Sequence, residues 1–179
     1  MKNQYAFLFA LLLSVTTAFA QTTLFSETFE SYTAGSKLVQ QAAGTAWTTW
    51  SNSPGSAEDP IVSNAFAHAG TKSVKIAPNN DLVLNLYDKT TGRYQIKMYN
   101  YIPSGKIGYF NVLQDFASSN SLYGMEVYFN DNGTGTVNAA GESTGKFTYT
   151  QGAWTAINLI IDVDDDFATL YINLSLIHI

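Results

Sequence analysis

The stretch GAWTAINLIIDVDDDFATLYIN, residues 152–173, decides the fold class that this 179-residue chain is expected to adopt. Side chains alternate between the two faces of a β-strand, and in residues 154–163 both of the resulting faces are partly apolar. This pattern predicts a strand that is covered on both sides. The three aspartates at 164–166 then interrupt the apolar run as a solvated turn does, and residues 167–172 alternate again. The stretch therefore predicts an antiparallel hairpin.

Short strands and turns of the same kind follow one another along the rest of the chain. The clearest strand is residues 93–102, in which Tyr94, Ile96 and Met98 share one face before a Pro-Ser-Gly-Lys turn. No segment has a convincing helical period. Many short strands with regular turn signals predict an all-β, antiparallel sandwich of two sheets. The further expected strands are residues 24–30, 45–52, 73–76, 82–87, 107–115, 123–130, 134–139 and 146–150.

The hairpin at 152–173 resembles the segment W-x-x-(apolar run)-D-x-(turn)-A-x-L-Y-(I/V)-(N/D) found late in concanavalin A-like lectin/glucanase domains, the laminin-G-like jelly rolls. Residues 92–116, GRYQIKMYNYIPSGKIGYFNVLQDF, are similar to an earlier hairpin of that superfamily. LFSETFESYTAGS at 24–36 and HAGTKSVKI at 68–76 resemble its opening strands, as met in secreted proteins of Bacteroidetes-type bacteria. The resemblance implies a jelly-roll fold. It implies function less well, because the superfamily includes lectins, glycoside hydrolases, polysaccharide lyases and adhesion modules.

Residues 1–20 have the pattern of a cleaved signal peptide. Lys2 supplies the positive start, residues 5–15 form the apolar centre, and Ala18-Phe19-Ala20 is a small-x-small cleavage site. The apolar run is too short to cross a bilayer as a helix. We therefore expect a secreted or cell-surface protein that begins at Gln21 and has no membrane span after cleavage.

The last six residues, LSLIHI at 174–179, do not fit the pattern of the rest of the sequence. Written as codons they resemble the transposon end used to build sequencing libraries, and the jelly-roll pattern expects a glycine and a polar turn at this point. The prediction is a β-sandwich over 21–173 that lacks its C-terminal strands, followed by a non-native tail. A native apolar strand is the alternative. A sandwich without its last strands has an exposed edge and is prone to aggregate.

Charge and composition exclude several classes of function. The formal net charge of −5 at pH 7 argues against nucleic acid or an anionic membrane as the partner. The chain has no cysteine and two histidines, His68 and His178, of which the second falls in the suspect tail. Thiol catalysis, a Ser-His-Asp triad and a typical zinc site are therefore unsupported.

A pair of carboxylates is the enzymatic alternative. Asp115 and Glu126 lie on expected neighbouring strands, as the acid and the nucleophile or base of a glycosidase would. The E-x-D-x-x-E pattern that jelly-roll glucanases place on one strand is absent. The simpler interpretation is two solvated carboxylates at strand ends.

Calcium is the one cofactor that the sequence suggests. Residues 162–166 carry a D-x-D-x-D run, but Phe167 replaces the glycine of an EF-hand and Asn173 replaces its twelfth-position glutamate. The run is therefore expected to be an acidic hairpin tip. Domains of the superfamily often hold a structural calcium ion near the opening strand, and this resemblance makes Glu27 and Glu30 the candidate ligands.

Glycan binding is predicted from one face of the sheet. Aromatic rings stack on sugar rings, and amide, carboxylate and ammonium groups bind hydroxyls, so a strand face that combines them suits a sugar groove. Tyrosines are also favoured on any exposed sheet face, which is the competing explanation. The leading prediction is a non-catalytic carbohydrate-binding or adhesion module, with a glycoside hydrolase or polysaccharide lyase second and a structural spacer without ligand third. The predicted ligand-binding residues are Lys97, Tyr99, Tyr101, Tyr109, Asn111, Glu126 and Tyr128.

Overall fold

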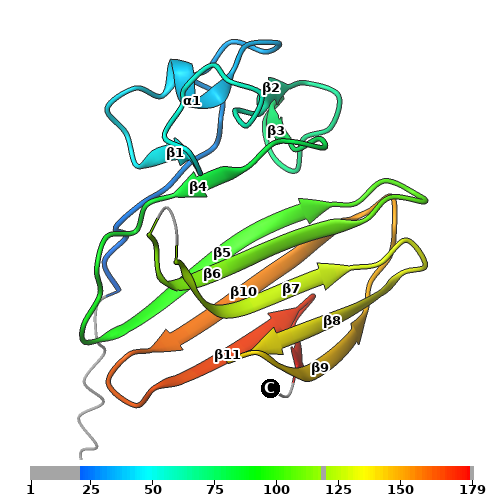
Figure 1. Ribbon diagram of the computed structural model, residues 1–179. Helices are drawn as coiled ribbons and strands as arrows, with labels where there is room; N and C mark the ends of the chain where they lie inside the picture. Colours follow the sequence, from blue (N-terminus) through cyan, green and yellow to red (C-terminus); the bar gives the residue numbers. More distant parts are fainter. Residues whose placement is uncertain (1–20, 118–119, 178–179) are drawn as a thin grey trace, which may run out of the picture.

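A computed structural model describes residues 21–117 and 120–177 of the chain (Figure 1). The predicted signal peptide at 1–20 and His178 lie outside these residues. Within the described ranges the fold is nearly all β, as predicted, with antiparallel pairing throughout the named strands. No helix in these ranges has the length and apolar character needed to cross a membrane.

Two four-stranded antiparallel sheets form the body of the molecule. The first has the order β12-β11-β10-β5 and the second β6-β7-β8-β9. Side chains from both sheets meet in one core, in which Val127 and Leu170 are fully buried. This arrangement is the two-sheet sandwich that the sequence predicts. The strands are β5 (Arg93–Tyr101), β6 (Gly108–Asp115), β7 (Leu122–Phe129), β8 (Thr134–Ala139), β9 (Glu142–Thr148), β10 (Trp154–Asp162), β11 (Phe167–Ile172) and β12 (Ser175–Ile177).

The predicted central hairpin is β10 and β11. Ile157 and Leu159 point into the core, while the alternate residues of β10 are half-buried on the opposite face. Asp164, Asp165 and Asp166 are exposed in the turn that joins the two strands. The hairpin therefore has the two covered faces that its apolar pattern predicts.

A smaller unit precedes the sandwich and contains one short helix and two strand pairs. Strand β1 pairs with β4, and β2 pairs with β3. The unit has a small core of its own around Leu38, Ala42 and Val62. Its elements are α1 (Leu38–Gln41), β1 (Trp47–Thr49), β2 (Ile61–Ser63), β3 (Ser73–Lys75) and β4 (Leu82–Leu84).

The predicted strand over residues 24–30 is wrong. The Glu27 carboxylate accepts hydrogen bonds from the N–H groups of Thr28 (2.8 Å) and Phe29 (2.7 Å), and Phe29 has a φ of 64°. A side chain that binds the next two backbone N–H groups holds the chain in a turn, which a period-two pattern does not reveal.

The smaller unit lies beside the β5 and β6 side of the sandwich (Figure 1). Two ring pairs connect them: Phe66 stacks on Tyr101 with centroids 4.3 Å apart, and His68 stacks on Tyr99 at 3.5 Å. Trp154 completes this cluster, 5.7 Å from His68. The outer side of the β5–β10 sheet is therefore partly covered by residues 64–68.

Three residues of the suspect tail belong to the first sheet. Residues 175–177 form the edge strand β12, which pairs with β11, and Ile177 is buried. Asn173 and Leu174 make the connection with φ values of 48° and 67°. The non-native origin of the tail stays a prediction, as does the truncation of the sandwich.

Candidate functional site

The seven residues predicted to bind a ligand do not share one face. Lys97, Tyr99 and Tyr101 lie on β5 in the first sheet, whereas the other four lie on β6 and β7 in the second. The single-face prediction is wrong because β5 and β6 do not pair as a hairpin. The buried Ile102 lies between them, and its side chain packs against Gly108 so closely that a Cβ there would clash. The chain thus turns a corner from one sheet to the other.

Four of the predicted residues do come together, on the outer face of β6 and β7. Tyr109 is paired with Tyr128 and Asn111 with Glu126 in the antiparallel register. The two tyrosine rings have centroids 4.9 Å apart. We call these four residues, Tyr109, Asn111, Glu126 and Tyr128, the tyrosine–glutamate patch.

Hydrogen bonds within the patch fix its side chains. The hydroxyls of Tyr109 and Tyr128 both donate to Glu126 Oε1, at 2.9 and 2.7 Å. Asn111 Nδ2 donates to the Tyr109 hydroxyl oxygen at 3.1 Å. In the described part of the chain, no side chain from another element hydrogen-bonds to these four. The patch is therefore organised by itself and presents its outer side to solvent.

The two phenols are donors rather than bases. Burial raises the pKa of Tyr109 well above the usual range, and the hydrogen bond and charge of Glu126 add to it. The hydrogen bond to Glu126 is the main reason why the pKa of Tyr128 is raised as well, followed by burial. Both hydroxyls consequently keep their protons at neutral pH, which suits hydrogen bonding and works against proton abstraction.

The same face extends over two further strands that the sequence did not single out. Thr136 of β8 is paired with Tyr128, Asn138 with Glu126, and Lys146 of β9 with Thr136. Val137 is fully buried, so its neighbours Thr136 and Asn138 point to the outer side. The alternation around Val137 was the signal from which these positions could have been found.

Two of the three predicted residues on β5 have a structural role. Tyr99 and Tyr101 are stacked by His68 and Phe66, so their rings hold residues 64–68 against the sheet. Lys97 is exposed beyond this contact. Since these tyrosines are already engaged within the chain, they are weaker candidates for ligand contact than the tyrosine–glutamate patch.

Asp115 and Glu126, the alternative catalytic pair, are far apart along the strands. Asp115 is paired with Leu122, whereas Glu126 is paired with Asn111, four residues away. At the rise of a strand this is a separation of about 13 Å. Retaining and inverting glycosidases need roughly 5–10 Å. The structure therefore does not bring this pair to a catalytic spacing.

Glu27 and Glu30, the candidate calcium ligands, are engaged by hydrogen-bond donors. Glu27 also accepts from the Tyr32 hydroxyl at 2.9 Å. Glu30 accepts from the Thr71 and Lys72 N–H groups and from the Thr71 hydroxyl, at 2.9, 2.8 and 2.7 Å. Among the residues that the structure describes, no three His, Cys, Asp or Glu side chains gather as metal ligands. In this arrangement both carboxylates organise loops.

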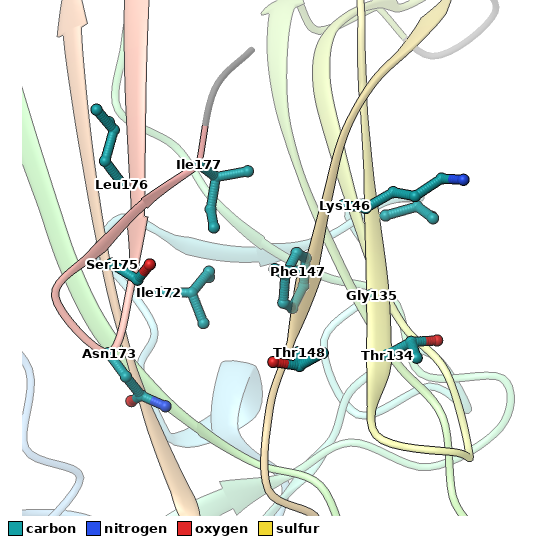
Figure 2. A pocket seen from close by; sticks show the side chains of 11 residues that line it. Thr134, Gly135, Lys146, Phe147, Thr148, Ile172, Asn173, Ser175, Leu176 and Ile177 are labelled. Atoms are coloured by element: carbon teal, nitrogen blue, oxygen red, sulfur yellow. The ribbon is translucent and has the colours of Figure 1, made fainter.

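A groove of about 820 Å³ opens between the edge strands of the two sheets (Figure 2). Figure 2 shows Ile172 and Ile177 on one side, pointing toward Phe147 on the other, while Lys146 points away. Since these three apolar side chains belong to the buried core, the groove is the open edge of the sandwich. None of the residues predicted to bind a ligand lines it.

The tyrosine–glutamate patch thus remains the best-organised predicted site. No protein-family model, curated protein or solved structure matches the chain.

Proposed function

We propose that this protein is a non-catalytic glycan-binding or adhesion module, and that the tyrosine–glutamate patch is its binding surface. One observation carries the proposal: two tyrosines, a carboxylate and an amide are held in fixed positions by mutual hydrogen bonds on an outer sheet face. Tyr109 is 46% exposed although its hydroxyl is anchored. An exposed ring with a fixed orientation suits stacking on a sugar ring, because little side-chain entropy is lost on binding.

The polar groups of the patch suit a polyhydroxylated ligand. Both phenols donate to Glu126 Oε1, and no described residue donates to Oε2. That oxygen is therefore available to accept from a ligand hydroxyl. Asn138 and Lys146 add an amide and an ammonium group further along the same face. A row of such groups next to aromatic rings favours an extended glycan over a small apolar ligand.

The alternative of a glycoside hydrolase or polysaccharide lyase has less support. Asp115 and Glu126 are separated by four strand residues. The raised pKa of Tyr109 disfavours a tyrosine base. The two-sheet antiparallel sandwich agrees with the resemblance to concanavalin A-like domains, whose members include lectins, and we keep that relationship as part of the proposal.

We also propose export to the cell surface or medium, on the signal-peptide pattern of residues 1–20.

The proposal is tested by electrophoresis of the whole chain through gels that contain one polysaccharide each. We expect retardation in at least one gel, without new reducing ends in the polymer. Tyr109→Ala and Glu126→Gln should each weaken this retention about tenfold. The matched control is Phe167→Ala, which removes a 62% exposed ring from the other sheet and should leave retention unchanged.

Three results would contradict the proposal. Equal retention of the patch variants and the unaltered chain would move the binding surface elsewhere. Shortened polymer with new reducing ends would establish an enzyme. Free migration in every gel of a broad panel would favour the spacer without ligand.

A further inference from the structure

A second concave surface lies between the smaller unit and the end of β6. Its volume is about 510 Å³. It uses no residue of the tyrosine–glutamate patch and none of the predicted site residues. We call it the junction hollow; the side chains that matter for its chemistry are Thr48, Asn52, Asn85, Tyr87 and Phe116.

The lining of the junction hollow has the composition of a neutral, polar ligand site. Tyr87 and Phe116 contribute aromatic surface, and Asn52 and Asn85 contribute amides, whereas the Trp47 ring packs against Phe25 and Phe29 within the smaller unit. None of the described residues that line it is charged. Sites for small molecules have volumes of roughly 300–1,000 Å³ and combine apolar walls with a few polar groups, so this hollow is within the usual range. The absence of charge from its lining disfavours anionic and cationic ligands.

Tyr87 is held at the hollow in an unfavourable backbone conformation. Its φ is 57°, in the left-handed region that non-glycine residues seldom adopt, and its side chain is 70% exposed. Its N–H donates to Asn85 Oδ1 at 2.8 Å, which helps to hold the loop in this shape. Burial of the Tyr87 ring does not offset the cost of this backbone conformation, since the ring is mostly in solvent. Strained residues of this kind cluster at binding sites, where the conformation serves the ligand.

The two parts of the molecule both contribute to the hollow. Phe116 follows β6 of the sandwich, whereas Trp47 and Tyr87 belong to the smaller unit and the segment after it. Phe116 also packs edge-on against Trp50, with centroids 5.1 Å apart. Trp50 belongs to the smaller unit and Phe116 to the sandwich. Their contact therefore holds the Phe116 side of the hollow in place relative to the side that the smaller unit forms.

We propose that the junction hollow binds a short neutral saccharide of one or two sugar units, as a second site distinct from the tyrosine–glutamate patch. The Tyr87 and Phe116 rings supply surfaces for the C–H faces of a sugar, and the Asn52 and Asn85 amides supply donors and acceptors for its hydroxyls. The inference goes beyond the proposed function, because it stands on different residues. The two proposals can fail separately.

The test is a titration of the whole chain with neutral mono- and disaccharides, followed by tryptophan fluorescence and saturation-transfer NMR. Glucose, galactose, mannose, xylose, cellobiose, lactose and chitobiose are the probes, with glucuronate as the charged comparison. We expect at least one neutral probe to bind with a Kd of about 1 mM or tighter, and glucuronate to bind more weakly. Tyr87→Gly and Phe116→Ala should each weaken binding about tenfold.

The variants separate binding from folding. Glycine adopts a φ of 57° without strain, so Tyr87→Gly should have an unfolding midpoint at least as high as the unaltered chain. Glu126→Gln should leave saccharide binding at the hollow unchanged. The inference is overturned if no neutral probe binds, if Tyr87→Gly binds as tightly as the unaltered chain, or if Glu126→Gln abolishes binding. Retention by a polysaccharide gel without binding of any short probe would refute the hollow and leave the proposed function standing.

Discussion

Tyr128 donates its hydroxyl hydrogen to Glu126 Oε1 over 2.7 Å, and Tyr109 donates to the same oxygen from the neighbouring strand. Both phenols have raised pKa values, for Tyr109 mainly because of burial and for Tyr128 mainly because of this hydrogen bond. A group whose pKa is higher in the folded than in the unfolded chain stabilises the fold below its unfolded pKa. That contribution is lost as the pH rises through the folded pKa.

We therefore expect the free energy of unfolding to fall as the pH rises above about 10, the pKa of an unfolded tyrosine. Tyr109→Phe and Tyr128→Phe remove the ionisable hydroxyls, so each should make this alkaline loss less steep. Urea unfolding at several pH values between about 8 and 11 measures the slope. Tyr149, whose pKa is raised by burial, contributes in the same direction and is common to all variants. An alkaline slope that is identical in Tyr109→Phe and the unaltered chain would rule out this linkage.

Glu30 gives the opposite dependence at acid pH. Its pKa is lowered, chiefly by the Thr71 N–H, then by the Thr71 hydroxyl. Its stabilisation is therefore present above the unfolded pKa near 4.5 and is lost as the pH falls through the folded pKa. Glu30→Gln should make the unfolding midpoint depend less on pH between about 6 and 3. Thr71→Val removes one hydrogen-bond donor to Glu30 and should have a smaller effect in the same direction. The prediction would be contradicted if the unfolding midpoint of Glu30→Gln depended on acid pH as strongly as that of the unaltered chain.

Asp59 connects helix α1 with the loop at Gly55 in the smaller unit. It is completely buried, and its carboxylate accepts from the N–H groups of Val39 (2.8 Å), Gln40 (3.0 Å) and Gly55 (2.9 Å). Asp59→Ala leaves these buried donors without their acceptor and should lower the free energy of unfolding by about 3 kcal/mol or more. Asp59→Asn keeps one carbonyl oxygen and should cost less. Urea unfolding measures both, with the exposed Asp131→Ala as the control that should change little.

The hairpin of β10 and β11 was predictable because both strands are long and their alternation is regular. The corner between β5 and β6 could not be predicted from the sequence. A turn written Pro-Ser-Gly-Lys looks the same whether the next strand pairs with the last one or joins the facing sheet. The difference depends on the packing of Ile102 against Gly108, which is a tertiary contact.

The same limit explains what was found and missed in the candidate site. Local alternation predicts that Tyr109, Asn111, Glu126 and Tyr128 share one side of two neighbouring strands, and the strand register shows this arrangement. Tyr99 does not belong with them, because its strand β5 lies in the other sheet, and nothing in that strand indicates this placement or that His68, 31 positions earlier, stacks on Tyr99. Asp59 and the junction hollow likewise depend on contacts between distant segments. Short-range patterns contain no information about such contacts.

The turn between β11 and β12 offers the last prediction. Asn173 and Leu174 are its two central residues, between the paired Ile172 and Ser175, and both have positive φ. Two-residue hairpin turns of this kind favour Asn-Gly, because glycine enters the left-handed region without strain. Leu174 has a φ of 67° and is 89% exposed, so its side chain contributes almost no packing in return.

Leu174→Gly should therefore raise the free energy of unfolding by about 1 kcal/mol. Leu174→Ala is the matched control, because it removes the exposed side chain but keeps the Cβ that causes the strain, and it should change stability little. Urea unfolding of the unaltered chain, Leu174→Gly and Leu174→Ala shows whether backbone strain or the exposed leucine side chain lowers the stability. If alanine stabilises the chain as much as glycine, exposure of the leucine side chain is the cause. If glycine destabilises it, β12 is held by contacts that depend on the leucine, and the strain at this turn is smaller than its φ implies.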